Sequence, residues 1–140
     1  GTFENSSFNG DISGWDTSRV TTMEDMFWDN PTFDQDLDMW DVSNVVDMTA
    51  MFGRATAFNG DVGAWTTSSL TEMNFLFFNA TSFNRPFFDS WNTSGVTNMT
   101  EIFSGATAFD NSVKAWDVSN VKSTVGMFFN AESFSNQGLN

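Results

Sequence analysis

The hydrophobic side chains of this sequence recur with a period of 25 or 26 residues. Tryptophan forms one series, with spacings of 25, 25, 26 and 25 residues, at Trp15, Trp40, Trp65, Trp91 and Trp116. Phenylalanine keeps the same period at Phe8, Phe33, Phe58, Phe83, Phe109 and Phe134. Such a period is typical of stacked repeats, in which one unit cannot bury its apolar side alone and its neighbours bury it instead. These recurring columns are therefore predicted to form the core.

Each unit contains two segments with different hydrophobic patterns. The first segment, as in 18–30, carries apolar residues at i, i+3, i+6 and i+7, which predicts a short helix. We expect its N-caps at the recurring serines Ser18, Ser43, Ser68, Ser94 and Ser119. The second segment runs from a Phe-Asn or Phe-Asp pair to the tryptophan. It is too short and too rich in Asn, Asp and Gly for a helix, so it predicts one short strand.

The predicted fold class is therefore α/β: a right-handed solenoid of leucine-rich-repeat type, with one short strand and one short helix in each 25-residue coil. We expect residues 1–140 to form a single repeat domain of five full coils and partial ends, as a unit or as a section of a longer array. The polar residue after each recurring phenylalanine is predicted to satisfy backbone groups along the stack, because buried backbone polar groups need partners. This polar ladder consists of Asn9, Asp34, Asn59, Asn84 and Asp110.

Two segments also carry a resemblance to a known family. The copies at 40–48 (Trp-Asp-Val-Ser-Asn-Val-Val-Asp-Met) and 58–62 (Phe-Asn-Gly-Asp-Val) resemble the repeat of the BspA-like leucine-rich-repeat surface proteins. The likeness recurs five times and spans nearly the whole chain. It implies a bacterial or protist protein that is secreted or attached to the cell surface and takes part in adhesion and protein–protein contact. It carries no catalytic residues over to this chain.

The charge balance narrows the range of partners. The chain has 18 acidic and 5 basic side chains and a formal net charge of -13, so phosphate backbones and anionic membrane surfaces would repel it. We expect no nucleic-acid partner, and no apolar run is long enough for membrane insertion. Because Cys and His are absent, thiolate chemistry, Ser-His-Asp triads and most transition-metal sites are excluded. We therefore expect no enzyme and no cofactor, with calcium as the one alternative.

Aromatic residues outside the recurring columns are candidates for partner binding, because packing does not obviously require them. One set is placed in a single column directly after the Met-Phe pair, where Gly53 and Ser104 also occur: Phe3, Trp28, Phe78 and Phe129. The remaining candidates are Phe75, Phe87 and Phe88. An exposed stripe of this kind would contact a protein, a glycan or a second copy of the chain. The alternative is additional core packing.

Two other sets of columns suggest further ligands. Asp11, Asp36 and Asp61 share one column, and stacked carboxylates of this kind can bind Ca²⁺. A solvated acidic face is the alternative. Threonine columns raise ice binding as a more distant function, and their members are Thr17, Thr67, Thr93, Thr32, Thr56, Thr81 and Thr107.

Four Asn-x-Ser/Thr sequons are candidate glycosylation sites in a chain that a eukaryote secretes. They lie at Asn5, Asn79, Asn92 and Asn98. Because the chain is rich in Ser, Thr and Asn, chance occurrence is the alternative explanation.

The sequence as a whole predicts a non-enzymatic binding or adhesion module, secreted or at the cell surface, whose side surface recognises a protein or a glycan. The main alternative is a structural subunit of a filament or surface coat, formed when solenoids associate through their ends or sides. Neither end shows a capping unit, and a bare stack exposes core and unpaired strand edges. Calcium or ice binding ranks third.

Overall fold

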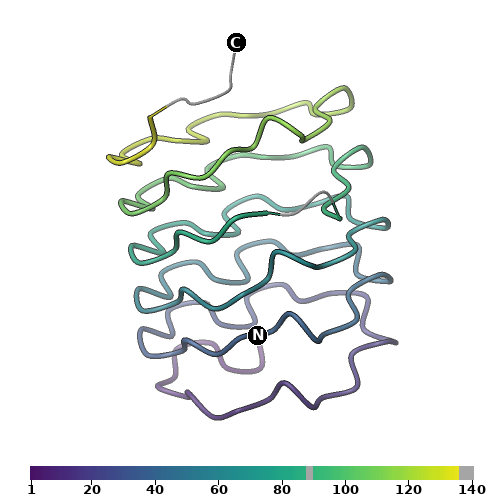
Figure 1. Ribbon diagram of the computed structural model, residues 1–140, viewed down its shortest axis with the longest axis vertical. Helices are drawn as coiled ribbons and strands as arrows, with labels where there is room; N and C mark the ends of the chain where they lie inside the picture. Colours follow the sequence, from purple (N-terminus) through teal and green to yellow (C-terminus); the bar gives the residue numbers. More distant parts are fainter. Residues whose placement is uncertain (88–89, 136–140) are drawn as a thin grey trace.

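The computed structural model describes residues 1–87 and 90–135, which wind into a stack of similar coils (Figure 1). The coils follow one another along the stack from the purple first coil to the yellow last coil. Isolated parallel bridges join each coil to the next and link Thr22, Asp47, Glu72, Asn98 and Ser123 in turn. Residues one period apart in the sequence therefore lie side by side in space.

The described residues contain no helix, and these isolated bridges are their only β-structure. The prediction of an α/β leucine-rich-repeat solenoid, with one helix and one strand in each coil, is therefore wrong. The segment that was predicted to be a helix, as in 18–30, is a series of tight turns. Met26 N donates to Met23 O at 3.2 Å, and Asn30 N donates to Phe27 O at 3.1 Å.

Backbone dihedral angles explain why the helix does not form. Asp25 (φ 53°) and Asp29 (φ 54°) lie in the left-handed region, where a right-handed helix cannot continue. Between the turns, amides point toward the neighbouring coil instead of along their own, and Phe27 N donates to Met51 O at 2.8 Å. Successive turns place residues i and i+3 on one face, so they produce the same apolar spacing as a helix.

The serines predicted as N-caps take part in turns of another kind. Ser18 donates from its backbone N and its Oγ to one carboxylate oxygen of Asp16, at 3.1 and 2.6 Å. Ser43 makes the same pair of hydrogen bonds to Asp41, at 3.0 and 2.6 Å. The hydroxyl and amide donors hold the pKa of both aspartates below its ordinary value.

Two columns of phenylalanine rings form the centre of the stack. In the first, successive ring centroids lie 5.5 to 5.7 Å apart along Phe27, Phe52, Phe77, Phe103 and Phe128. In the second, they lie 5.9 to 6.1 Å apart along Phe33, Phe58, Phe83, Phe109 and Phe134. Within one coil the two rings are only 3.8 or 3.9 Å apart. The inner members of both columns are fully buried, so the recurring columns form the core as predicted.

The tryptophan column adds a directional contact between coils. Trp40 Nε1 donates to Ile12 O at 3.0 Å, and Trp65 Nε1 donates to Leu37 O at 2.7 Å. Trp91 Nε1 continues the series to Val62 O at 2.8 Å, so these three indoles satisfy their one donor on the preceding coil, whereas the buried Nε1 of Trp116 has no partner among the described residues.

The predicted polar ladder is confirmed. Each side chain accepts a hydrogen bond from the backbone N of the equivalent residue one coil later, at 2.7 to 3.0 Å. The acceptors are Oδ1 of Asn9, Asp34, Asn59 and Asn84, and Asp110 continues the series to Ser135. Asn and Asp both supply Oδ1, which explains why the column contains either residue.

This ladder predicts a difference between two substitutions at Asp34. Asp34→Asn keeps the Oδ1 acceptor for Asn59 N, so it should leave stability nearly unchanged, whereas Asp34→Ala removes the acceptor and should destabilise the protein by about 1 kcal/mol. Urea unfolding followed by tryptophan fluorescence measures both effects. Equal stability of the two variants would contradict the structural role of the ladder.

Candidate functional site

Two columns on one side of the stack differ in residue type from coil to coil. The groove column consists of Trp28, Gly53, Phe78, Ser104 and Phe129, and the turn column consists of Asp25, Ala50, Phe75, Glu101 and Gly126. The stack forms with Gly, Ala or Ser at these positions, so packing does not require large side chains there. Large residues in these columns are therefore candidate functional residues.

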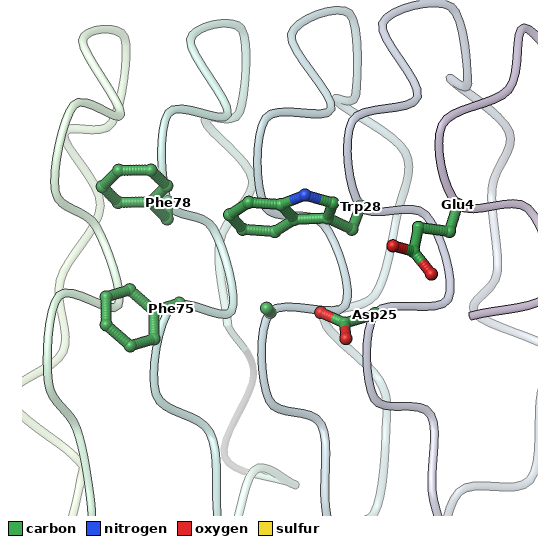
Figure 2. Close-up of a pocket in the computed structure, with 6 residues that line it drawn as sticks. Glu4, Asp25, Trp28, Phe75 and Phe78 are labelled. Carbon is green, nitrogen blue, oxygen red and sulfur yellow. The ribbon is translucent and has the colours of Figure 1, made fainter.

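The two columns border a groove of about 290 Å³. Its lining residues are Glu4, Asp25, Trp28, Ala50, Phe75 and Phe78. Figure 2 shows Trp28 and Phe78 in one row, Asp25 and Phe75 in a second row beside it, and Glu4 at one end. One end of the groove is therefore aromatic, and the other end carries two carboxyl groups.

Three aromatic side chains shape the apolar part of the groove. The Trp28 and Phe78 rings are parallel within 6°, with centroids 6.1 Å apart, although the two residues lie two coils apart. Phe75 meets Phe78 edge to face, at 5.8 Å and 85°. Trp28, Phe75 and Phe78 are all only partly buried, so a ligand can reach their rings.

Gly53 makes the contact between Trp28 and Phe78 possible. A Cβ atom added at Gly53 would lie 2.3 Å from two atoms of the Trp28 ring. The indole therefore lies over the coil that carries Gly53 and reaches the next large residue of the column. A larger residue at this position would displace the ring.

Phe75 occupies an unfavourable backbone conformation. Its φ is 58°, a left-handed value that costs a bulky residue about 1–3 kcal/mol. Gly126, in the same column, has φ 62° and avoids this cost. The whole turn column is left-handed, including Ala50 (φ 55°) and Glu101 (φ 50°), so this conformation belongs to the turn, and the bulky aromatic side chain is what distinguishes Phe75.

The acidic end of the groove has an electrostatic imbalance. Burial raises the pKa of Asp25, and the neighbouring charges of Glu4 and Asp47 raise it further, while the amino group of Gly1 lowers it. That amino group lies 3.1 Å from Glu4. Within residues 1–87 and 90–135, no hydrogen bond or ion pair involves the Asp25 carboxylate. Asp25 is therefore an anion beside an aromatic surface, and only the Gly1 amino group partly offsets its charge.

The structure brings Trp28, Phe75 and Phe78 together, and it places the other predicted contact residues elsewhere. Phe129 is 64% exposed and lies outside the groove. Phe3 belongs to the core, because it stacks on Phe27 at 5.6 Å. The assignment of Phe3 to the column of Trp28 is therefore wrong. The first coil is one residue shorter: Phe3 N donates to Met26 O, as Phe27 N donates to Met51 O.

The 26-residue spacing from Trp65 to Trp91 contains one residue more than the other repeats, and this insertion changes the place of Phe87. Phe87 packs against the core, with its ring centroid 4.7 Å from Trp91 and 5.2 Å from Trp116. Its assignment as a surface contact residue is therefore corrected to core packing. Phe88 lies outside the described residues.

Glu4, Asp25 and Ala50 line the groove and were not predicted. The sequence contained a signal for Asp25 and Ala50, because they share the column of Phe75 and vary from coil to coil. Glu4 lies in the shortened first coil, and its place in the groove follows only from the structure.

The aspartates predicted to bind calcium make hydrogen bonds to the backbone. Asp11 accepts from Ser13 N at 2.9 Å, Asp36 from Asp61 N at 2.8 Å, and Asp61 from Gly63 N at 2.9 Å. Among the residues that the structure describes, no three His, Cys, Asp or Glu side chains are grouped so as to hold a metal ion. Calcium binding stays a prediction.

The sequon asparagines and the threonines have varied surroundings. Asn92 and Asn98 accept hydrogen bonds from Ser94 N and Thr100 N, both at 3.0 Å. Asn5 and Asn79 have φ of 51° and 53°.

One of the two threonine columns consists of Thr17, Thr67 and Thr93. Their hydroxyls point inward and donate to backbone oxygens of the next coil, so this column cannot order water at the surface.

Comparison with known proteins places the chain in a family. The profile of the family described as "Mycoplasma protein of unknown function, DUF285" matches residues 1–93 and again residues 60–140, so the chain belongs to this family. The two overlapping matches agree with a repeat protein. The family match does not confirm the resemblance to BspA-like leucine-rich-repeat proteins. No curated protein and no solved structure matches the chain. In the described ranges, no helix has the length and hydrophobicity of a membrane span.

The imbalance at Asp25 predicts that this residue lowers stability at neutral pH. Its folded-state pKa lies above the ordinary 3.8, so the ionised carboxyl disfavours the folded state at pH 7, and this effect disappears as the pH falls below 3.8. Asp25→Asn should therefore raise the melting temperature more at pH 7 than at pH 3. Asp38→Asn, at an exposed site outside the groove, is the control. An equal shift at both pH values would contradict the electrostatic account, since it would reflect only the ease with which Asn adopts a left-handed conformation.

Proposed function

We propose that this protein is a non-enzymatic binding or adhesion module that acts outside the cell or at its surface, and that it contacts its partner through the groove. One observation carries the proposal: partly exposed aromatic residues line the groove at positions where other coils have Gly, Ala or Ser. Exposed apolar patches bordered by polar residues mark interaction sites. The resemblance of the repeat to BspA-like surface proteins supports the extracellular location.

The left-handed Phe75 supports the same proposal. Every residue of the turn column is left-handed, and a phenylalanine is less favourable there than the glycine at Gly126, so stability does not explain the aromatic side chain. Gly53 gives further support, because the smallest residue lies where the Trp28 ring needs room. Both features put aromatic surface in one place without adding to the core.

A binding panel tests this function. Immobilised glycans and cell-surface proteins are probed with the unaltered chain and with the double variant Trp28→Ala/Phe78→Ala. The double variant should bind at least about tenfold more weakly, as expected when aromatic anchors of an interface are truncated. Met39→Ala is the matched control, since Met39 is 76% exposed and lies outside the groove. A ligand that binds all three proteins equally would exclude the groove as the contact site.

Self-association into a filament or coat is the second candidate. The aromatic columns support it, because their outermost rings, Phe8 and Phe134, are only partly buried while the inner rings are fully buried. A second copy stacked on either ring would complete its burial. Light scattering over a range of concentrations should then show a mass that increases with concentration. A monomer at every concentration would rule this candidate out.

A further inference from the structure

The groove combines an apolar surface with one kind of polar group. Trp28, Ala50, Phe75 and Phe78 contribute mainly carbon, and the charged lining side chains are the carboxylates of Glu4 and Asp25. These two groups lie toward the same end, beside Trp28 (Figure 2). A ligand that fits this arrangement needs an apolar part and a positive charge at one end.

The surrounding charges leave this end of the groove negative. The Arg54 guanidinium lies 3.6 Å from Asp29 and is paired there. The Gly1 amino group is paired with Glu4. Asp47 adds a further negative charge near Asp25 and raises its pKa. The chain as a whole carries -13, so a cation is attracted to this end both locally and over a longer range.

We propose, on the basis of the binding function above, that the groove takes a lysine or arginine side chain from a basic segment of a partner protein. The alkyl stem of the side chain lies along Trp28 and the Phe75–Phe78 pair, because long cationic side chains cover apolar surface with their stems. The charged head group lies at Asp25 and Glu4, beside the face of the indole, where a cation–π contact adds to the charge attraction.

The polarity of the groove favours this occupant over a sugar. Its volume of about 290 Å³ is at the lower limit for small-molecule pockets and admits either one side chain or one sugar ring. A sugar presents hydroxyl groups in several directions, and among the lining side chains the hydrogen-bond acceptors are the carboxylates at one end. A cation also relieves the repulsion among Asp25, Glu4 and Asp47, which a neutral sugar does not.

Proton–nitrogen correlation NMR of the full chain tests this inference through the indole N–H signals. The probe is a short peptide of alternating glycine and lysine, acetylated and amidated at its ends, and a glycine–glutamine peptide is the neutral control. Trp28 is assigned with the Trp28→Phe variant. Trp65 is the internal reference, because it is 1% exposed and donates to Leu37 O. The lysine peptide should shift the Trp28 signal and leave the Trp65 signal in place.

Two charge variants separate a site from general attraction. Asp25→Asn should weaken lysine-peptide binding about three- to fivefold, the usual effect of removing one partner of a partly exposed charge pair. Asp38→Asn, which removes an equal charge from an exposed position outside the groove, should change it much less. Equal weakening by both variants would overturn the inference, because the peptide would then respond only to net charge.

The remaining outcomes distinguish this inference from the proposed function. If a neutral oligosaccharide shifts the Trp28 signal and the lysine peptide does not, the groove is a binding site with a different ligand, and only this inference fails. If neither probe shifts Trp28 and the panel also finds no groove-dependent ligand, both proposals fail.

Discussion

Stacking of aromatic rings between coils is the interaction on which the rest of this structure depends. Within one coil the two phenylalanine rings stack on each other at 3.8 or 3.9 Å, and the rings of the next coil bury this pair at centroid distances of 5.5 to 6.1 Å. The coils have no helix and no extended strand in the described residues that would hold their shape alone. The backbone hydrogen bonds made between the turns, the polar ladder and the indole hydrogen bonds join one coil to its neighbour, so stability is a property of the stack.

This constraint also separates structure from function within the chain. A column that stacks must repeat its residue type, because each ring needs an equivalent ring above and below. Columns on the outside have no such requirement, and two of them vary freely along one side. There the sequence places Trp28, Phe75 and Phe78 beside the carboxylates of Asp25 and Glu4. For these two columns the other coils serve as a comparison: a coil that has Gly, Ala or Ser at the same position still stacks, so a large side chain there is not required for stacking.

Much of this organisation could be predicted from the sequence, and the errors have physical causes. The core columns and the ladder from Asn9 to Asp110 follow from the period alone. The helix was wrong because successive turns with residues such as Asp25 in the left-handed region reproduce the i, i+3 spacing. Phe3 and Phe87 were misplaced because a shortened coil and an inserted residue change the register at those two points.

The groove itself was only partly predictable. Variation within a column indicated Trp28, Phe78 and Phe75. The contact between the Trp28 and Phe78 rings could not be predicted, because it requires the indole to lie over Gly53, which has no side chain. Glu4 and Asp25 reach the same groove from neighbouring coils. The spacing of Glu4 and Asp25 in the sequence does not predict that they lie close together. The side chain of a left-handed residue such as Asp25 points in a different direction from one in a helix or strand.

Thermal unfolding of the variant Phe75→Gly/Phe78→Ser tests most directly the claim that the groove aromatics are not needed for folding. Each substitution introduces a residue that another coil already has in the same column, Gly126 and Ser104. The account predicts a melting temperature equal to or above that of the unaltered chain, since the glycine removes strain at φ 58°. A marked fall in melting temperature would contradict it and would assign these rings to the core.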